Sequence, residues 1–240
     1  MIDNRDLAFP KNTEIIKKLC DRRFGIGGDG LILLENGKNV DFTMVYYNSD
    51  GNESTMCGNG GRCIVAFAHF LNIFEDKCKF LAIDGLHEAE MNFGTVKLKM
   101  IDVENIKNIE NDFELNTGSP HFVKYVEDIE NYNVYQNGYN IRNSEMYVKE
   151  GINVNFVEKI DENKIFVRTY ERGVEDETYS CGTGVTACAI SFMLKNKTQK
   201  VDVKVLGGSL KVFAEQTENG FKNIWLEGPA KKVYKGEITL

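Results

Sequence analysis

The sequence predicts a mixed fold of the α/β (α+β) class, built from two similar domains. A strand pattern, a polar loop, the motif Cys-Gly-x-Gly and an apolar helical run occur twice in the same order, once around Cys57 and once around Cys181. These cysteines are separated by about half of the 240-residue chain, which indicates duplicated domains rather than a solenoid of short repeats. Helices and strands also alternate without the regular βαβ order of a doubly wound sheet.

The first half of the chain is expected to hold two helices and several strands. Residues 13–23 have apolar side chains at helical spacing, with Thr13 as the N-cap. Strands are predicted at 31–35 and 40–48, the second from its alternation of apolar and polar residues. A helix is predicted from about residue 58. Three short strands follow it, at 78–84, 86–93 and 95–102.

The second half repeats this order after a polar stretch. Residues 104–118 lack periodicity and are expected to form the crossover between the domains. Residues 164–172 have a strand pattern, and Cys181 then opens the apolar run Val185–Leu194, which predicts a helix enclosed by its own strands. Three strands follow, at 201–206, 209–214 and 223–227.

The composition is that of an ordinary globular protein. Apolar residues make up 42% and charged residues 27% of the chain, and the net charge is −7. This acidic balance argues against nucleic acid as a partner, because phosphate binding requires a clustered basic surface. The sequence has neither a signal-peptide pattern nor an apolar run of about 18 residues that would span a membrane. We therefore expect a cytoplasmic protein without a membrane partner, whose six cysteines are reduced.

Each Cys-Gly-x-Gly motif places a thiol at the start of an apolar helix. The first turn of a helix exposes unpaired N–H groups and carries about half a positive charge, which favours a thiolate. Cys57 and Cys181 are therefore usable acid/base groups. Two such thiols on opposite faces of one carbon are what the inversion of a stereocentre requires, since one removes a proton and the other supplies one. If the two domains pack about a pseudo-twofold axis, both helix ends face one cleft, and racemase or epimerase chemistry is expected.

The glycines after each cysteine suit the binding of an anion. Without side chains, Gly58, Gly60, Gly182 and Gly184 allow a ligand to approach the backbone, whose N–H groups can hold a carboxylate.

The other four cysteines are expected to be core residues. Free cysteine is among the most buried residue types, and core packing is the favoured interpretation of Cys20, Cys63, Cys78 and Cys188. No metal site is expected either. Cys188 lies two helical turns from Cys181, about 10 Å, which is too far for both to bind one zinc ion, and no CxxC pair exists.

Two longer stretches around the cysteines match a known family. NSDGNESTMCGNGGRC (48–63) and YERGVEDETYSCGTG (170–184) resemble the two active-site signatures of diaminopimelate epimerases. The similarity continues through LCDRRFGIGGDG, TGSPHFV, INVNFV and EGPAKKVYKGEITL, and so covers nearly the whole chain. It implies two pseudo-symmetric domains, each a strand barrel around a central helix, and the cofactor-independent interconversion of LL- and meso-2,6-diaminopimelate in lysine and peptidoglycan precursor synthesis.

The resemblance also implies an organisation for the chain. It divides the sequence into an N-terminal half at 1–115 and a C-terminal half at 116–228, and leaves open that residues 229–240 return to the first half. It further implies a homodimer that acts on a small amino acid and needs no cofactor.

Roles for individual residues follow from the same resemblance. It makes Cys57 and Cys181 the catalytic pair, one acting as thiolate base and the other as thiol acid. His121 and Glu171 match positions thought to tune the pKa of those thiols. The N–H groups after each cysteine would stabilise the charge that develops during proton removal. The residues that match substrate-binding positions are Asn48, Gly58, Asn59, Ser119, Asn153, Glu171, Arg172, Gly182 and Thr183.

The sequence departs from the family's pattern in three places. The family's first strand, with its histidine, glycine and asparagine-aspartate motif, has no counterpart before MIDNRD, so the first domain is expected to lack that strand. Gly30 stands where some members have a glutamine that binds substrate, and Ser119 stands where many have asparagine.

Other functions remain open from the sequence. A proline or hydroxyproline racemase uses the same pair of thiols, although such enzymes usually have histidine at the position of Asn59. A histidine or other amino-acid racemase of similar sequence is also left open. The alternatives outside racemases are a truncated homologue that binds an amino acid without turnover, and a thiol redox protein.

Overall fold

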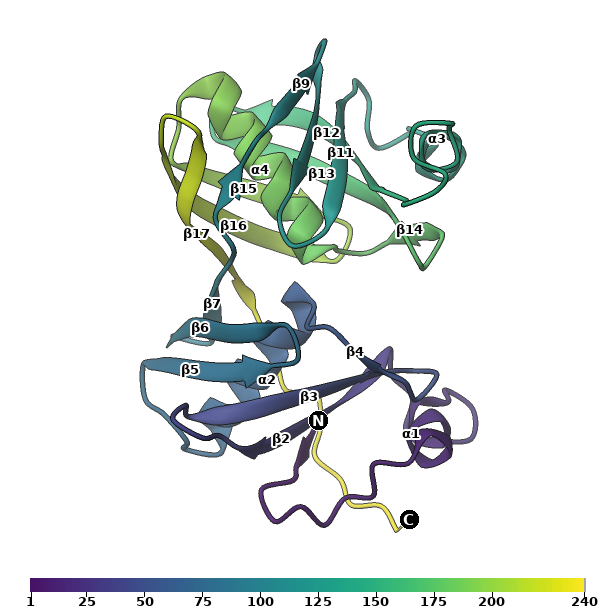
Figure 1. The fold of residues 1–240 in the computed structure, drawn as a ribbon, viewed down its shortest axis with the longest axis vertical. Helices are drawn as coiled ribbons and strands as arrows, with labels where there is room; N and C mark the ends of the chain where they lie inside the picture. The colour runs from purple at the N-terminus through teal and green to yellow at the C-terminus, as the bar shows by residue number, and fades with distance from the viewer. Residues whose placement is uncertain (240) are drawn as a thin grey trace. The chain divides into compact units, whose positions relative to one another are not determined.

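The chain divides into two compact units. The computed structural model describes residues 1–239, which hold four helices and seventeen strands (Figure 1). One unit comprises Met1–Leu98 together with residues 229–239, and the other comprises Lys99–Gly228. The boundary between the units lies after residue 98, whereas the sequence placed it after residue 115.

Residues 104–118 form strands of the second unit, so the predicted crossover is wrong. β8 (Val103–Glu104), β9 (Lys107–Ile109) and β10 (Asp112–Asn116) lie in this stretch. β10 pairs antiparallel with β9 and with β11 (Pro120–Tyr125), which ties it to the second unit. Only Phe113 and Leu115 turn inward in β10, so the alternation that marks the strand is short and surrounded by polar residues.

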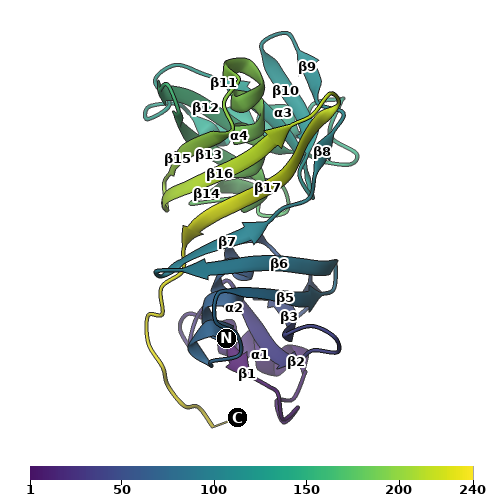
Figure 2. The same cartoon turned by 90° about the vertical axis from the view of Figure 1, so that its left-hand side faces the viewer.

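The first unit is a mixed sheet with one helix on each face. β2 (Gly30–Asn36), β3 (Phe42–Asn48), β5 (Lys77–Ala82), β6 (Gly85–Asn92) and β7 (Thr95–Lys99) follow one another across it. Figure 2 shows β5, β6 and β7 side by side. α1 (Thr13–Cys20) packs against Leu31 and Leu33, whereas α2 (Gly58–Phe70) lies near Ile32 on the other face. Alternate residues of β2 thus support two helices.

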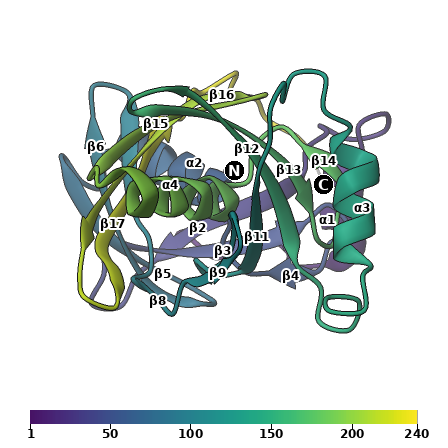
Figure 3. The same ribbon diagram turned by 90° about the horizontal axis from the view of Figure 1, so that it is seen from above.

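In the second unit a curved sheet surrounds one helix (Figure 3). Its neighbouring strands are β11, β12 (Asn153–Asp161), β13 (Lys164–Glu171), β15 (Lys200–Val205), β16 (Gly208–Gln216) and β17 (Gly220–Pro229). α4 (Gly182–Asn196) packs against β10 to β13, β15 and β16. Every residue from Gly184 to Met193 is buried. The enclosed helix predicted from the run Val185–Leu194 is therefore confirmed.

The two units repeat the same nine elements. The order β1-α1-β2-β3-β4-α2-β5-β6-β7 recurs as β11-α3-β12-β13-β14-α4-β15-β16-β17, where β1 is Ile2–Asp3, β4 is Glu53–Ser54, α3 is Val134–Arg142 and β14 is Asp176–Thr178. In both units the first strand is parallel to the second, which is antiparallel to the third. The third strand is antiparallel to the short fourth and parallel to the fifth. These shared pairings confirm the predicted duplication.

β1 occupies the place beside β2 that β11 occupies beside β12. It has two residues, Ile2 and Asp3, where β11 has six. The sequence analysis expected the first domain to lack the family's first strand, because the motif of that strand is absent; the structure has a strand of only two residues at this place.

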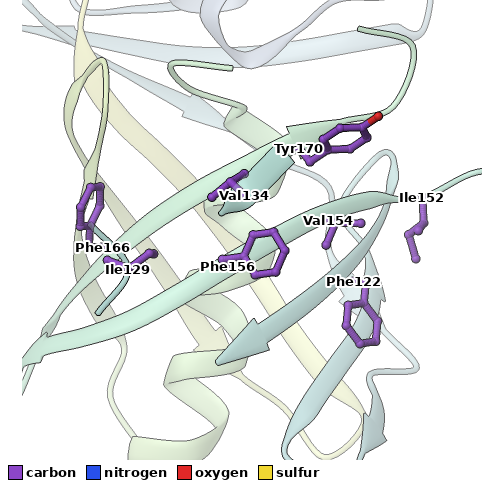
Figure 4. Close-up of a cluster of buried hydrophobic side chains, with 8 residues drawn as sticks. All are labelled: Phe122, Ile129, Val134, Ile152, Val154, Phe156, Phe166 and Tyr170. Atoms are coloured by element: carbon purple, nitrogen blue, oxygen red, sulfur yellow. The ribbon is translucent and has the colours of Figure 1, made fainter. Parts of the chain in front are cut away.

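α3 is the helix that the sequence analysis missed. Only Val134 and Gly138 are buried in it, so no apolar stripe marks it. A side chain at Gly138 would overlap Tyr170, which explains a glycine inside this helix. α3 packs against β12 and β13 at a cluster of eight buried side chains (Figure 4). They are Phe122, Ile129, Val134, Ile152, Val154, Phe156, Phe166 and Tyr170.

Asn12, and not Thr13, is the N-cap of α1. Its side-chain oxygen accepts hydrogen bonds from the backbone N–H groups of Glu14 and Ile15. Both asparagine and threonine are good N-cap residues, and two in succession leave the helix start ambiguous by one position. α1 ends at Cys20, three residues before the predicted end. Of the four cysteines expected in the core, three are buried and Cys63 is half-buried.

Candidate active site

Cys57 and Cys181 occupy the same position in the repeated order of elements. Cys57 is the N-cap of α2 and Cys181 is the N-cap of α4, each with an extended backbone. Each is followed by Gly-x-Gly in the first helical turn. The unpaired N–H groups of that turn favour negative charge at the N-cap. The prediction that each motif places a thiol at the start of a helix is therefore confirmed.

The two sulfur atoms have different surroundings. Cys57 is exposed, and its Sγ accepts a hydrogen bond from the backbone N–H of Gly60 at 3.2 Å. Cys181 is only 7% exposed, and its Sγ lies 3.4 Å from the hydroxyl oxygen of Thr183. An N–H donor favours a thiolate because the anion is the stronger acceptor, whereas a hydroxyl can either donate or accept. The two thiols are therefore not equivalent.

The first turn of α4 is held by hydrogen bonds and by close packing. The hydroxyl of Thr117 donates to the carbonyl oxygen of Thr183 at 2.8 Å, and the hydroxyl of Thr186 donates to that of Gly182 at 2.9 Å. A Cβ at Gly184 would overlap Oδ1 of Asn155. Glycine at this position therefore allows α4 to approach β12 closely.

His121 is a fully buried residue of β11 whose tautomer is set by Asn155. Nδ2 of Asn155 lies 3.1 Å from the carbonyl oxygen of Phe122 and 3.1 Å from Nδ1 of His121. Because a carbonyl oxygen only accepts, the atom that faces both groups is the donating NH2, and Nδ1 must accept. Oδ1 of Asn155 accepts from the hydroxyl of Thr169 at 3.0 Å, which holds the amide in this orientation. The imidazole proton therefore lies on Nε2.

Burial also keeps this imidazole neutral. It lowers the pKa of His121 to about 3, and the nearby guanidinium of Arg172 acts in the same direction. The buried Nε2–H of His121 has no hydrogen-bond partner among residues 1–239. His121 is thus a neutral donor, and any influence on a thiol comes through a hydrogen bond and not through a positive charge.

Ser119, Asn153 and Arg172 form one hydrogen-bonded group. Nδ2 of Asn153 donates to Oγ of Ser119 at 2.8 Å, and Oδ1 accepts from the backbone N–H of Arg172 at 2.9 Å. The guanidinium of Arg172 donates to the carbonyl oxygen of Glu150 at 2.9 Å and lies 3.5 Å from Oγ of Ser119. Three residues predicted to bind substrate are therefore neighbours in the second unit.

Glu171 is a half-buried carboxyl at the end of β13. Burial raises the pKa of Glu171, and a hydrogen bond from the hydroxyl of Thr178 at 2.9 Å opposes this effect. A carboxyl with a raised pKa exchanges protons more readily near neutral pH than an exposed one.

The remaining predicted residues lie in the first unit. Asn48 is exposed at the end of β3, where Gly30 pairs with it across β2 and β3. Its backbone carbonyl accepts from the N–H of Gly51 at 3.0 Å, so Asn48 also closes a turn. Asn59 lies in the first turn of α2, and its Oδ1 accepts from Nη2 of Arg62 at 2.8 Å.

Comparison of the chain with known proteins identifies the family to which it is related. The model of the diaminopimelate epimerase family matches residues 1–103 and 113–233. The chain is 53% identical over 242 residues to a diaminopimelate epimerase from Flavobacterium psychrophilum, which covers 99% of this chain and 94% of that protein. The chain belongs to the diaminopimelate epimerase family. A diaminopimelate epimerase from Chlorobaculum tepidum is 42% identical over 252 residues, which cover 100% of this chain and 96% of that protein.

The fold of the diaminopimelate epimerase family extends to more distant proteins. A phenazine biosynthesis protein of the PhzF family from Bacillus anthracis superposes with a TM-score of 0.76 at 14% identity, and the match covers 99% of this chain and 91% of that one. At this identity the likeness shows the fold alone. The predicted α/β class is therefore confirmed.

The sequence analysis missed residues that support the predicted ones, Asn155 and Thr169 above all. Asn153 and Asn155 alternate with apolar residues in INVNFV, and a buried amide is costly unless it is hydrogen-bonded. Two buried amides on one side of a strand therefore indicate a hydrogen-bonded polar network on that side, and this signal was available in the sequence. Thr169 lies opposite Asn155 in the register of β12 and β13, and no sequence pattern reveals that pairing.

Within residues 1–239, no group of three or more His, Cys, Asp or Glu side chains is arranged to hold a metal ion. None of the helices in the same range is long and apolar enough to cross a membrane.

Proposed function

We propose that this protein epimerises LL-2,6-diaminopimelate to meso-diaminopimelate by proton transfer between the substrate and two thiols, Cys57 and Cys181. Membership of the diaminopimelate epimerase family makes the protein an isomerase. One observation carries the two-thiol proposal. Each unit starts a helix with a cysteine N-cap followed by Gly-x-Gly, in a chain that is 53% identical to a diaminopimelate epimerase.

In the first proposed step, one thiolate removes the α-proton. A sulfur electron pair forms the new S–H bond, and the pair from the broken C–H bond stays on the α-carbon, delocalised into the adjacent carboxylate. The N–H groups of Gly58 and Asn59, or of Gly182 and Thr183, would stabilise the negative charge that develops.

In the second proposed step, the other thiol completes the inversion. Its S–H bond breaks as a new C–H bond forms on the opposite face of the α-carbon. The base of the first step ends as a thiol and the acid of the second step ends as a thiolate. The protonation states of Cys57 and Cys181 are therefore exchanged in each turnover.

Side chains of the second unit suit the polar ends of the substrate. The guanidinium of Arg172 matches the geometry of a carboxylate, and Ser119 and Asn153 orient it through their shared hydrogen bonds. His121, as a neutral Nε2–H donor, and Glu171, as a carboxyl of raised pKa, are suited to influence which sulfur holds the proton.

The proposal also places the enzyme in the cytoplasm as a homodimer. A cytoplasmic location suits the mechanism, because both thiols must stay reduced to act as acid and base. Sedimentation velocity of the purified protein measures the oligomeric state, and cell fractionation measures the location.

The test of the mechanism is isotope exchange in heavy water. Reduced protein is incubated with LL-diaminopimelate in D2O, and the meso isomer and its α-deuterium are followed by chiral chromatography and NMR. The parent protein is expected to form labelled meso product, and Cys57→Ala and Cys181→Ala are expected to form none. Cys20→Ala changes a buried cysteine of α1 and is the control that retains activity.

Two outcomes would contradict the proposal in different ways. Full turnover by Cys57→Ala or by Cys181→Ala rules out the two-base scheme. If the protein racemises proline, hydroxyproline or histidine and leaves diaminopimelate unchanged, diaminopimelate is ruled out as its substrate.

A further inference from the structure

We propose that Arg142 is a positioning residue for Arg172, because it pairs with Glu175 and thereby leaves the guanidinium of Arg172 free to bind a carboxylate of the substrate. The inference rests on the proposed function, in which Arg172 holds one polar end of diaminopimelate. It also gives a role to α3, the helix that the sequence analysis missed.

Arg142 lies in the last turn of α3, which packs against β13 and β14 (Figure 3). Its side chain is 17% exposed, and its Nε lies 3.4 Å from Oε1 of Glu175. This Nε is buried and makes no hydrogen bond to residues 1–239, so its contact with the carboxylate is an ion pair. Because Arg142 is half-buried, the attraction is stronger than in a fully exposed pair.

The carboxylate of Glu175 is held in a turn that also contains Arg172. The backbone N–H of Glu175 donates to the carbonyl oxygen of Glu171 at 2.8 Å, which closes the turn. Oε1 of Glu175 accepts from the backbone N–H of Gly173 at 3.1 Å, and Oε2 accepts from the hydroxyl of Tyr170 at 3.2 Å. The carboxylate therefore lies beside the residue that follows Arg172.

The backbone of Glu175 has a conformation that glycine adopts more readily. Its φ of 58° lies in the left-handed region, which is costly for a residue with a side chain. The contacts of the carboxylate compensate for this cost. The N–H of Gly173, the charge of Arg142 and the hydroxyl of Tyr170 hold the pKa of Glu175 below its ordinary value, so the carboxylate is ionised at neutral pH.

Arg142 and Arg172 approach each other at Gly151. A Cβ at Gly151 would lie 2.6 Å from Cδ of Arg172 and 3.0 Å from Cζ of Arg142. Both arginine side chains therefore pass over the same side of Gly151. The carboxylate that pairs with Arg142 is thus close to Arg172 as well.

The contacts of Arg172 within residues 1–239 are to uncharged oxygen atoms. Its guanidinium donates to the carbonyl oxygen of Glu150 at 2.9 Å and lies 3.5 Å from Oγ of Ser119. A guanidinium has more N–H donors than these two contacts use, and its fork matches both oxygens of a carboxylate. The charge of Arg172 is therefore available to a bound anion.

Without the charge of Arg142, the carboxylate of Glu175 is expected to turn toward Arg172. Both residues belong to one turn, and a carboxylate beside a guanidinium gains charge-assisted hydrogen bonds. The carboxylate of the protein would then occupy the donors that the substrate needs. Arg142 thus increases the affinity for substrate by binding the competing carboxylate.

The test measures the reactivity of Arg172 without substrate. Phenylglyoxal, which modifies the neutral form of arginine side chains, is added to the protein, and modification of Arg172 is quantified by mass spectrometry. The variants are Arg142→Gln, Glu175→Gln and the double variant with both changes. Lys204→Gln removes another cation of the second unit that pairs with a carboxylate, that of Glu130, and is the matched control.

Removal of the Arg142 charge is expected to slow the modification of Arg172. In Arg142→Gln the rate should fall about tenfold, because an adjacent carboxylate raises the pKa of a guanidinium by about one unit. The double variant lacks that carboxylate and should react at the rate of the parent. Glu175→Gln and Lys204→Gln should also react like the parent. Thermal melting followed by circular dichroism establishes which variants are folded.

Arg168 is the internal standard for an arginine that pairs with a carboxylate. Its Nε and Nη2 donate to the two carboxylate oxygens of Glu177 at 2.6 and 2.7 Å. Arg168 should therefore react slowly in the parent and in every variant, and Arg172 should approach that slow rate only in Arg142→Gln.

The kinetic constants for diaminopimelate should follow the same pattern. In Arg142→Gln the KM should rise about tenfold, which corresponds to the loss of one charge-assisted contact, and kcat should stay unchanged. The double variant should recover the KM of Glu175→Gln. If Arg142 only stabilised the fold, its substitution would raise KM equally with glutamate or glutamine at position 175.

An unchanged rate of Arg172 modification in folded Arg142→Gln overturns the inference, and so does an equal fall of that rate in the double variant. If Arg142→Gln does not fold, Glu175→Gln decides. A rate equal to that of the parent supports the inference, whereas a rate about tenfold higher shows that Glu175 already pairs with Arg172 and overturns it. A protein that reacts as expected but leaves diaminopimelate unchanged would refute the proposed function and leave the role of Arg142 intact.

Discussion

Cys57 and Cys181 share a place in the fold but differ in the groups that surround sulfur. Sγ of Cys57 is exposed and accepts a hydrogen bond from the backbone N–H of Gly60, whereas Cys181 is buried beside the hydroxyl of Thr183. A two-base epimerase needs one thiolate and one thiol at the start of each turnover. The different neighbours of the two sulfur atoms agree with the proposal that they take different roles in a turnover.

A buried histidine at neutral charge makes stability depend on pH. The pKa of His121 is lowered to about 3 in the folded protein, whereas an unperturbed histidine titrates near about 6.5. Between these values the unfolded chain binds a proton that the folded chain does not bind. The contribution of His121 is therefore fully present above about pH 6.5 and is lost by about 1.4 kcal/mol per unit as the pH falls toward 3.

Urea unfolding of the parent and of His121→Gln at two pH values measures this contribution. Between about pH 7 and about pH 5, the parent should lose about 2 kcal/mol more of its free energy of unfolding than the variant loses. Above about pH 7 the two proteins should depend on pH in the same way, which serves as the internal control. Equal losses below that pH would mean that His121 titrates normally in the folded state.

The helices that carry the cysteines could be predicted from the sequence because each is a long apolar run with a marked start. Elements without such a run were missed. α3 buries only Val134 and Gly138, and β10 turns only Phe113 and Leu115 inward, so neither carries enough periodic apolar residues to be recognised. Their positions depend on packing against strands that are distant in the sequence.

The same limit applies to the candidate site. The positions of the two cysteines and the glycines after them could be predicted, because the start of a helix is determined by residues that are neighbours in the sequence. The contacts of Asn155 with His121 and Thr169 depend on the pairing of β12 with β11 and β13, and this register cannot be derived from the residues alone. The contact between Arg62 and Gly58 could have been predicted from the sequence, because a residue four positions after Gly58 lies one helical turn above it.

The first turns of α2 and α4 are expected to respond oppositely to one substitution. Gly60 and Gly184 each lie three residues after the cysteine. A Cβ at Gly60 would have its nearest contact with Sγ of Cys57 at 3.4 Å, which is ordinary van der Waals contact. Gly60→Ala should therefore stabilise the protein by up to about 1 kcal/mol through helix propensity.

At Gly184 the same substitution meets the Asn155 side chain. Overlap with Oδ1 forces α4 or the amide to move, so Gly184→Ala should lower the free energy of unfolding by about 1–3 kcal/mol. It should also reduce epimerase activity, because the shift displaces Cys181. Urea unfolding of both variants is the measurement, and stabilisation by Gly184→Ala would contradict the packing described here.

At the scale of the whole molecule, the two repeated units bury their central helices to different extents. The second unit adds β8 to β10, and α4 is buried throughout its central turns. α2 keeps half-buried residues at Cys63, Ala66 and Phe67. Most of the polar side chains predicted to bind substrate also lie in the second unit. The first unit contributes Cys57, whose thiol is exposed.

The second unit should fold without the first. Lys99–Gly228 is one continuous segment, and its core surrounds α4. A fragment of residues 99–228 is expected to give dispersed amide signals by NMR and one cooperative transition in urea. The fragment 1–98 is the comparison, and it should be less stable because its unit also includes residues 229–239, where Lys232 lies 3.8 Å from the ring of Phe70.

Activity should not accompany the folding of this fragment. Residues 99–228 contain Cys181 but not Cys57, so the fragment lacks one of the two thiols that the proposed mechanism requires. The fragment is therefore expected to bind diaminopimelate weakly or not at all in calorimetry and to form no meso product. A non-cooperative fragment would contradict the independence of the second unit. Turnover by a folded fragment would contradict the assignment of one essential thiol to each unit.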